Sequence, residues 1–204
     1  MHNLSAGNIE IASCTFKPLP RNSFHSLSVV IITQTKKGGT MFTKSLQEAI
    51  NEQINKELYS AYLYLSMAAY FEGQNFGGFS NWMKIQYQEE TGHAMKFFAY
   101  LHDRGGTVTL KAIAQPPVKF KTPLEIFKQV LEHEKEVTDS INKLYELALK
   151  EKDYPTQSTL QWFINEQVEE EKNATSIIQT LEMAGNSPVS IMMVDRQLSA
   201  RKAG

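Results

Sequence analysis

The chain has 204 residues, 42% of them hydrophobic and 21% charged, which is typical of a soluble protein with one domain and a substantial core. Its formal net charge of -1 is too weak to indicate nucleic-acid binding, and no segment reads as a membrane span. The single cysteine, Cys14, excludes a disulfide framework within one chain and any cysteine-rich metal site. It fits a reducing compartment, so we expect a cytoplasmic protein.

Residues 1–40 differ from the rest, because they are rich in Ser, Thr, Asn, Gly and Pro and show no helical period. We expect a disordered or non-native leader here, outside a single domain at residues 41–204. A transit peptide is an alternative, but the arginine-rich amphipathic helix is missing, and a secretory signal would need a longer apolar run. A further hypothesis makes Met41 the natural start, since residues 37–39 can be encoded by a purine-rich run resembling a bacterial ribosome-binding site.

Two long helices open this domain. The first is predicted from about residue 43 or 45 to residue 71 or 72, with Ser45 and Glu48 at the spacing of a capping box. A glycine-containing connection at residues 73–78 ends it. The second helix is predicted at about residues 79–104, where two glycines stop it. Because the connection is short, the two helices should be antiparallel neighbours.

A long loop is predicted at residues 107–121, which carry two prolines and no helical stripe. Such a segment reaches up to ~50 Å, whereas each long helix spans ~40 Å, so the loop can return the chain along a whole bundle. The third helix should therefore run parallel to the second. Thr122 as N-cap, Pro123 at the first helical position and Glu125 at the third mark its start, and it continues to about residue 152.

The fourth helix follows a tight turn at residues 153–155 and is predicted to run to about residue 184, where Gly185 ends it. A short last helix is expected at about residues 190–201, after Pro188. These elements indicate an all-α four-helix bundle with a long crossover loop and a short fifth helix.

Each long helix carries one glutamate inside its apolar stripe, at Glu57, Glu90, Glu134 and Glu170, and His93 shares the face of Glu90. One such glutamate alone is more often a satisfied core residue. Four together are costly, because two carboxylates about 4 Å apart repel by ~4 kcal/mol at an effective dielectric of about 20. A cation among them removes this cost. Oxygen ligands with one nitrogen and no thiolate favour iron or manganese over structural zinc.

Motifs on all four helices resemble those of the prokaryotic-type non-haem ferritins, which belong to the ferritin-like di-iron family. The resemblance covers residues 41 to about 201. It implies a ferritin-like four-helix bundle that stores iron: Fe(II) is oxidised by dioxygen at a di-iron ferroxidase centre, and Fe(III) is kept as a mineral inside a homo-oligomeric shell, a 24-mer. The matching motifs are Asn51-Glu52-Gln53, Glu57-Leu58-Tyr59-Ser60, Gln88-Glu89-Glu90-Thr91-Gly92-His93, Glu134, Asp153-Tyr154-Pro155 and Asn165-Glu166-Gln167-Val168-Glu169-Glu170-Glu171.

The resemblance also implies roles for the residues of the four stripes. Glu57, Glu90 and His93 would hold the first iron, and Glu90 would bridge to a second iron held by Glu134 and Glu170. These five residues are the expected centre of Fe(II) oxidation.

Five further residues are implied around this pair. Gln167 would lie close to the second iron, and Tyr64 would stand beside the centre and supply an electron during oxygen reduction. Bacterial-type ferritins often have a third iron position. Its acidic ligands match Glu89, Glu166 and Glu169, and Glu170 is shared with the second iron.

Differences from neighbouring families narrow the expected cofactors. Bacterioferritins carry a second Glu-x-x-His on the fourth helix, where this chain has Gln167-x-x-Glu170, and their haem-ligating methionine motif is absent. We therefore expect iron and no haem. Met83 and Met95 read as ordinary core or interface residues. Rubrerythrins add a cysteine-rich module that one cysteine cannot build.

The remaining prominent side chains receive structural interpretations. Solvent exposure is expected for His102 and His133, and contact with another subunit for the apolar face of the last helix, which carries Met192 and Met193. A bundle-core position is expected for the large aromatic residues, namely Trp82, Trp162, Phe97, Phe98 and Phe163, although Trp162 also suits electron relay.

Two alternatives to the ferroxidase remain open at this point. In one, the carboxylates buffer iron or other divalent metals without oxidising them; the complete set of glutamates with His93 argues against this. In the other, the helical phase is wrong and the acids face solvent. In each case we expect neither nucleic acid nor a membrane as partner.

Overall fold

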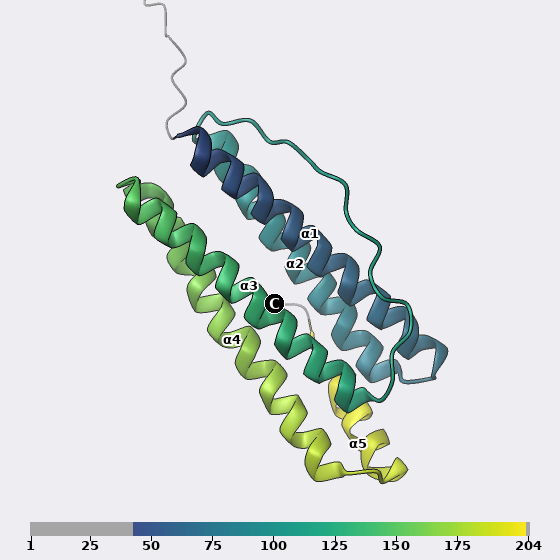
Figure 1. Ribbon diagram of the computed structural model, residues 1–204. Coiled ribbons are helices and arrows are strands. Elements are labelled where there is room, and N and C mark those ends of the chain that lie inside the picture. Colours follow the sequence, from purple (N-terminus) through teal and green to yellow (C-terminus); the bar gives the residue numbers. More distant parts are fainter. Residues whose placement is uncertain (1–42, 203–204) are drawn as a thin grey trace, which may run out of the picture. The chain divides into compact units, whose positions relative to one another are not determined.

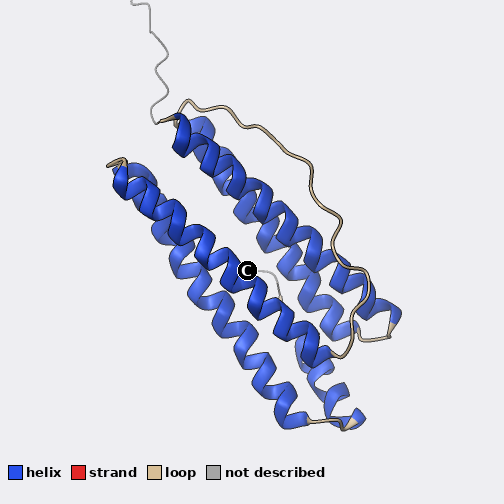
Figure 2. Cartoon of the chain, viewed as in Figure 1, coloured by secondary structure: helices blue, strands red, loops and turns tan. Residues whose placement is uncertain are grey.

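The computed structural model describes residues 43–202; the expected leader at residues 1–40 and the domain start at residue 41 lie outside this range. Five α-helices and no strands are found within it (Figure 2). This confirms the predicted all-α fold. None of these helices is both long and apolar enough to cross a membrane. The helices are α1 (Lys44–Gly73), α2 (Gly77–Asp103), α3 (Pro123–Lys150), α4 (Tyr154–Ala184) and α5 (Pro188–Leu198).

The four long helices are joined as two antiparallel pairs, α1 with α2 and α3 with α4 (Figure 1). Between the pairs, residues 104–122 form an extended loop that runs along α1 and brings the chain back to the end of the bundle where α2 began. As a result α3 runs parallel to α2, as the loop length predicts.

Side chains of α1 hold the crossover loop in place. The Asn51 amide donates a hydrogen bond to the carbonyl of Thr107 at 2.9 Å and accepts one from the N–H of Thr109 at 2.7 Å. Near the other end, the Tyr70 hydroxyl donates to the carbonyl of Lys121 at 2.6 Å. The loop is therefore fixed to the bundle along its length.

Several helix ends differ from the prediction. Thr43 caps α1 by accepting a hydrogen bond from the N–H of Leu46 at 3.1 Å, so the capping box predicted at Ser45 is wrong: the helix begins one residue before that serine. The connection to α2 spans only residues 74–76, because both helices extend into the glycines expected to separate them. At the end of α3, Lys152 adopts a φ of 57°, which stops the helix at residue 150.

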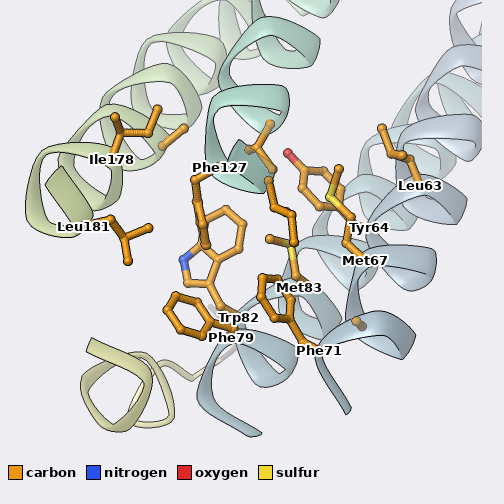
Figure 3. Packing of buried hydrophobic residues seen from close by; sticks show 14 of the residues in the cluster. Leu63, Tyr64, Met67, Phe71, Phe79, Trp82, Met83, Phe127, Ile178 and Leu181 are labelled. Carbon is orange, nitrogen blue, oxygen red and sulfur yellow. The ribbon is translucent and has the colours of Figure 1, made fainter. Parts of the chain in front are cut away.

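Buried apolar side chains form two clusters, one toward each end of the bundle. The first is rich in aromatic residues, and Figure 3 shows Phe71, Phe79, Trp82 and Phe127 interlocked, with the rings of Phe71 and Phe79 stacked 5.0 Å apart. The second lies toward the start of α1 and is built by smaller aliphatic residues around a stacked aromatic pair with ring centroids 3.9 Å apart. Between the two clusters, every long helix contributes buried polar residues instead.

The short helix α5 docks on the start of α2. Its Val194 is buried in the first apolar cluster, and the Asp195 carboxylate accepts a hydrogen bond from the N–H of Phe79 at 2.9 Å, which caps α2. The backbone of α5 passes so close to Gly78 that a Cβ there would lie 1.6 Å from the carbonyl oxygen of Asp195. Glycine at this position is therefore required for the docking.

Replacing Gly78 by alanine should displace α5. We expect a loss of about 2–4 kcal/mol in the free energy of unfolding, because the clash is with backbone rather than with a flexible side chain. Chemical denaturation followed by circular dichroism measures it. Gly77→Ala is the matched control, since a Cβ at Gly77 meets nothing within 4 Å. Equal stability of the two variants would contradict the docking described here.

Candidate metal centre

The polar layer between the two apolar clusters brings together the glutamates predicted from the four stripes. Glu57 comes from α1, Glu90 from α2, Glu134 from α3 and Glu170 from α4, and none is more than 4% exposed. Each sits near the middle of its helix, where the apolar period would otherwise place a hydrophobic residue. Burying four carboxyl groups in this way is unfavourable unless they meet donors, protons or a cation.

The tightest group is formed by Glu57, Glu90 and His93. Each offers one possible ligand atom, and these atoms all lie within 4.8 Å of one another. His93 Nδ1 is 3.5 Å from Glu90 Oε2. Both Glu57 Oε2 and Glu90 Oε1 are buried with no hydrogen-bond partner among the described residues. Two carboxylate oxygens without partners beside an imidazole form a donor set suited to a divalent transition metal.

The carboxylates on the other two helices are held by hydrogen bonds. Gln167 Nε2 donates to the Glu134 carboxylate at 3.1 Å and to the Glu134 backbone carbonyl at 3.2 Å. The Tyr64 hydroxyl donates to the same carboxylate. Gln86 Nε2 donates to Glu170 at 2.9 Å. Each carboxylate is thereby oriented by a neighbouring side chain and keeps further lone pairs for a cation.

Burial changes the protonation of this layer. It raises the pKa of Glu57 to about 7 and that of Glu170 to about 8. Burial, with the charges of the neighbouring glutamates, also raises the pKa of Glu90 well above its usual range. Burial lowers the pKa of the His93 imidazole to about 4. Near neutral pH the imidazole is thus an unprotonated ligand, and a cation that binds the carboxyl groups will release protons.

The residues predicted for a third position are divided by the structure. Glu89 and Glu166 are both partly buried; burial raises the pKa of Glu89, and the charge of Glu166 adds to that shift, which places the two side chains near each other. Glu169 is exposed on α4. In addition, Arg201 Nη2 lies 2.6 Å from Glu89 Oε2. The position therefore holds a cationic side chain that the sequence did not suggest.

Comparison with known proteins decides the family. The family described as Ferritin-like domain matches residues 47–184, most of the described chain. The chain belongs to the ferritin family. This confirms the family predicted from the motifs.

Individual ferritins match closely. A bacterial non-heme ferritin of Bacteroides fragilis is 45% identical over 161 residues, which are 79% of this chain and 100% of that protein. One from Staphylococcus aureus is 38% identical over 79% of this chain and 97% of its own length. Among solved structures, an open pore ferritin from the hyperthermophilic archaeon Archaeoglobus fulgidus is 46% identical, with a TM-score of 0.79 over 80% of this chain and 100% of its own.

Two glutamines that the sequence did not single out support the buried glutamates of this ferritin. Gln53 Nε2 donates to Glu57 at 2.9 Å, and Gln53 itself accepts a hydrogen bond from Ser140 at 2.6 Å. Gln86 holds Glu170 in the same way. Only the Gln53 contact has a local signal, because Gln53 lies four residues before Glu57 on the same helix; Gln86 bonds a glutamate of another helix, which no local spacing reveals.

Two other expectations for the ferritin chain are corrected. His133 is not exposed: it is partly buried, forms a 2.8 Å hydrogen bond with Ser60, and its ring lies edge-on to Tyr64 at 6.5 Å. Trp162 is not in the core, being 38% exposed, with the Lys96 ammonium 2.9 Å above its ring. Both side chains meet a residue of another helix, Ser60 for His133 and Lys96 for Trp162, which their own helical stripes do not reveal. The exposure predicted for His102 is confirmed.

The other aromatic and methionine assignments are largely confirmed. Trp82, Phe97 and Phe163 are core residues, whereas Phe98 is partly buried. Met83 is buried as expected, whereas Met95 is exposed, so it is not a core residue and its place in an interface stays a prediction.

Proposed function

We propose that this protein oxidises Fe(II) with dioxygen at the polar layer of the bundle and stores the Fe(III) product as a mineral inside an oligomeric shell. Iron is thus a substrate and cargo. The observation that carries the proposal is the pair of buried carboxylate oxygens, from Glu57 and Glu90, that lack partners and lie beside the His93 imidazole. In a ferritin-family bundle, iron is the cation that this donor set fits best.

The site residues would bind two iron ions at neighbouring positions. Glu57 and His93 would bind one ferrous ion, Glu134 and Glu170 would bind the second, and Glu90 would lie between them. Each ferrous ion gives up one electron, so two of them supply the pair that one dioxygen molecule accepts. Hard carboxylate ligands stabilise the ferric product and so favour the oxidation.

Tyr64 and Gln167 would assist this chemistry through Glu134. Both donate hydrogen bonds to its carboxylate, which fixes its orientation toward the second position. Burial and the nearby carboxylates raise the pKa of the Tyr64 phenol well above its ordinary value, so the phenol keeps its proton until it gives up an electron. We propose that, after the iron pair has supplied two electrons, the phenol supplies a third and a ferrous ion at the third position a fourth, which with protons from solvent would complete the reduction of dioxygen to water.

The site would also release its product. The chain has Gln167-x-x-Glu170 where a second Glu-x-x-His would complete a symmetric site, so the second position lacks an imidazole and the centre would act as a transit site rather than as a retained di-iron cofactor. Ferric iron would then move to the mineral. A third iron position beside the pair would use Glu89, Glu166 and Glu169, with Glu170 shared.

Assembly into a homo-oligomer, a 24-mer by analogy with the family, would supply the shell. The support on this chain is the apolar face of α5, where Val189, Met192 and Met193 are each at least 64% exposed. Light scattering of the purified protein tests it, and a stable monomer would refute it. We further propose a cytoplasmic location, with neither nucleic acid nor membrane as partner.

Stopped-flow absorbance after mixing ferrous iron with oxygenated protein tests the ferroxidase itself. We expect oxidation much faster than in protein-free buffer. The competing function is passive buffering of divalent metals by the same carboxylates, which binds iron without oxidising it. A rate equal to that of protein-free buffer, with iron still bound, would establish the buffer instead.

Replacing both Glu89 and Glu169 by glutamine should leave the binding of the first two irons unchanged but alter the iron consumed per dioxygen and slow later turnovers. The reason is that these side chains would bind only the third iron. Oxygen-electrode stoichiometry over successive iron additions measures the effect. Loss of the first two irons would assign the two residues to the primary site.

A further inference from the structure

Arg201, just after α5, places its guanidinium group against the acidic residues of the expected third iron position. Its Nη2 donates to Glu89 Oε2 at 2.6 Å, and its Cζ lies 4.7 Å from the centroid of the Trp82 ring. Glu166 and Glu170 are the other carboxylates whose charges act on Glu89 or Arg201. A positive side chain therefore sits where an additional cation would bind.

This placement is built into the fold. Asn81, on α2, donates its amide hydrogens to the carbonyls of Arg201 at 3.2 Å and Leu198 at 3.5 Å. The N–H of Arg201 continues the last turn of α5 by bonding to the Leu198 carbonyl at 3.2 Å. Because α5 is in turn fixed to the start of α2, the arginine has a defined position rather than a random one on a loose tail.

The charge of Arg201 acts on the carboxylates that a third cation would need. Burial raises the pKa of Glu89, and Arg201 opposes that rise more than any other group. For Glu170 too, burial raises the pKa and Arg201 works against it. In the absence of metal the guanidinium thus favours the ionised form of both carboxyl groups, as a bound ferrous ion would.

The Arg201 guanidinium is nevertheless only partly buried and only partly hydrogen-bonded. Its side chain is 20% exposed and Glu89 is 29% exposed, so water reaches both. Arg201 Nη1 is buried with no hydrogen-bond partner among the described residues. A guanidinium bound through one of its two terminal nitrogens has a weaker hold than a fork-like pair would have, which makes exchange with a metal ion feasible.

We propose that Arg201 is a tethered competitor for the third cation: it occupies the position in the metal-free protein, and a divalent ion binds there by displacing it. The inference rests on the proposed function, because it assumes that Glu89, Glu166 and Glu169, with Glu170 shared, form that position. Its consequence is that the third ion binds more weakly than the carboxylates alone would allow, so the primary pair fills first. The tail would then control the order of filling.

The test is an anaerobic calorimetric titration with Zn(II), a divalent probe that is not oxidised, on the wild type and on Arg201→Gln. We expect the first two ions to bind alike and the third to bind about tenfold more tightly to the variant, because removing the competitor makes the position fully available. Lys202→Gln is the matched control: it removes the same charge from an exposed neighbour and should behave as the wild type.

A second readout reports displacement directly. The chain has two tryptophans, so in a Trp162→Phe background Trp82 is the only one. Its emission should change as the third Zn(II) binds and the guanidinium leaves the ring, and Arg201→Gln in the same background should remove that step.

Three results would overturn the inference. Equal third-ion affinities in Arg201→Gln and Lys202→Gln would show that the arginine does not compete, while intact binding of the first two ions would leave the proposed function standing. Tighter third-ion binding to Arg201→Gln, without a change in Trp82 emission when the wild type binds the ion, would show that the guanidinium repels the ion but is not displaced by it. Failure of the wild type to bind even two ions would refute the proposed function and this inference with it.

Discussion

Glu90→Gln should lose rapid iron oxidation by about 100-fold or more while keeping the fold. Glu90 lies between the two proposed iron positions, with one oxygen 3.5 Å from His93 and the other without a partner. Glutamine keeps the volume of the side chain but not its negative charge. Without metal, the variant should be as stable as the wild type or about 1–2 kcal/mol more stable, because a buried ionisable group is gone.

Stopped-flow absorbance measures the oxidation, and urea unfolding of the metal-free proteins measures the stability. The matched control is Glu146→Gln, which makes the same substitution at an exposed position of α3. It should change neither quantity. Oxidation kinetics unaltered in Glu90→Gln would mean that the buried acids are structural.

Raising the pH from 5 to 8 should destabilise the metal-free protein by several kcal/mol. Burial raises the pKa of Glu57 to about 7 and that of Glu170 to about 8, from an ordinary value of 4.5. In this range each folded carboxyl keeps a proton that the unfolded chain has lost, so unfolding releases protons and becomes easier as the pH rises. Shifts of this size correspond to roughly 3 kcal/mol for Glu57 and roughly 5 kcal/mol for Glu170 once both pKa values are passed.

His93 acts in the opposite direction. Its pKa falls from 6.5 to about 4 on folding, so its contribution is lost as the pH drops below 6.5. Above pH 6.5 it stays neutral in both states and only the carboxyl groups remain, which makes pH 6.5 to 8 the cleanest interval.

Urea unfolding at several pH values, with a chelator and then with Zn(II), tests this expectation. A cation replaces the protons at the carboxyl groups, so its affinity grows with pH and the decline should flatten or reverse. A Glu57→Gln and Glu170→Gln double variant should lose part of the slope without metal, and adding Glu90→Gln should remove most of the rest, because burial also raises the pKa of Glu90. Stability that stays constant or rises between pH 6.5 and 8 without metal would disprove the assigned protonation.

The long helices and the site glutamates were predictable because each depends on one local pattern. A stripe with a period of 3.6 residues identifies the buried face, and a carboxylate such as Glu134 inside it is conspicuous. Amides are less so: Gln53 and Gln86 fit a buried stripe or a surface equally well until their partners are known.

Contacts between distant segments were not predictable. The burial of His133 depends on Ser60 of another helix, and Arg201 meets a glutamate 112 positions earlier in the chain. That meeting requires α5 to fold back on α2, which depends on the fit at Gly78. The start of α1 was uncertain for a simpler reason, because Thr43 and Ser45 are both good N-caps and only the tertiary structure selects one.

The proposed iron ligands are divided unequally between the two helix pairs. The iron affinities of the two positions should therefore depend differently on how the pairs pack together. Glu57, Glu90 and His93 all belong to the hairpin of α1 and α2, a continuous stretch of sequence, whereas Glu134 and Glu170 belong to the hairpin of α3 and α4. Affinity at the first position should therefore depend on one hairpin alone. Affinity at the second needs both hairpins in register, so it reports on how firmly the halves of the bundle hold together.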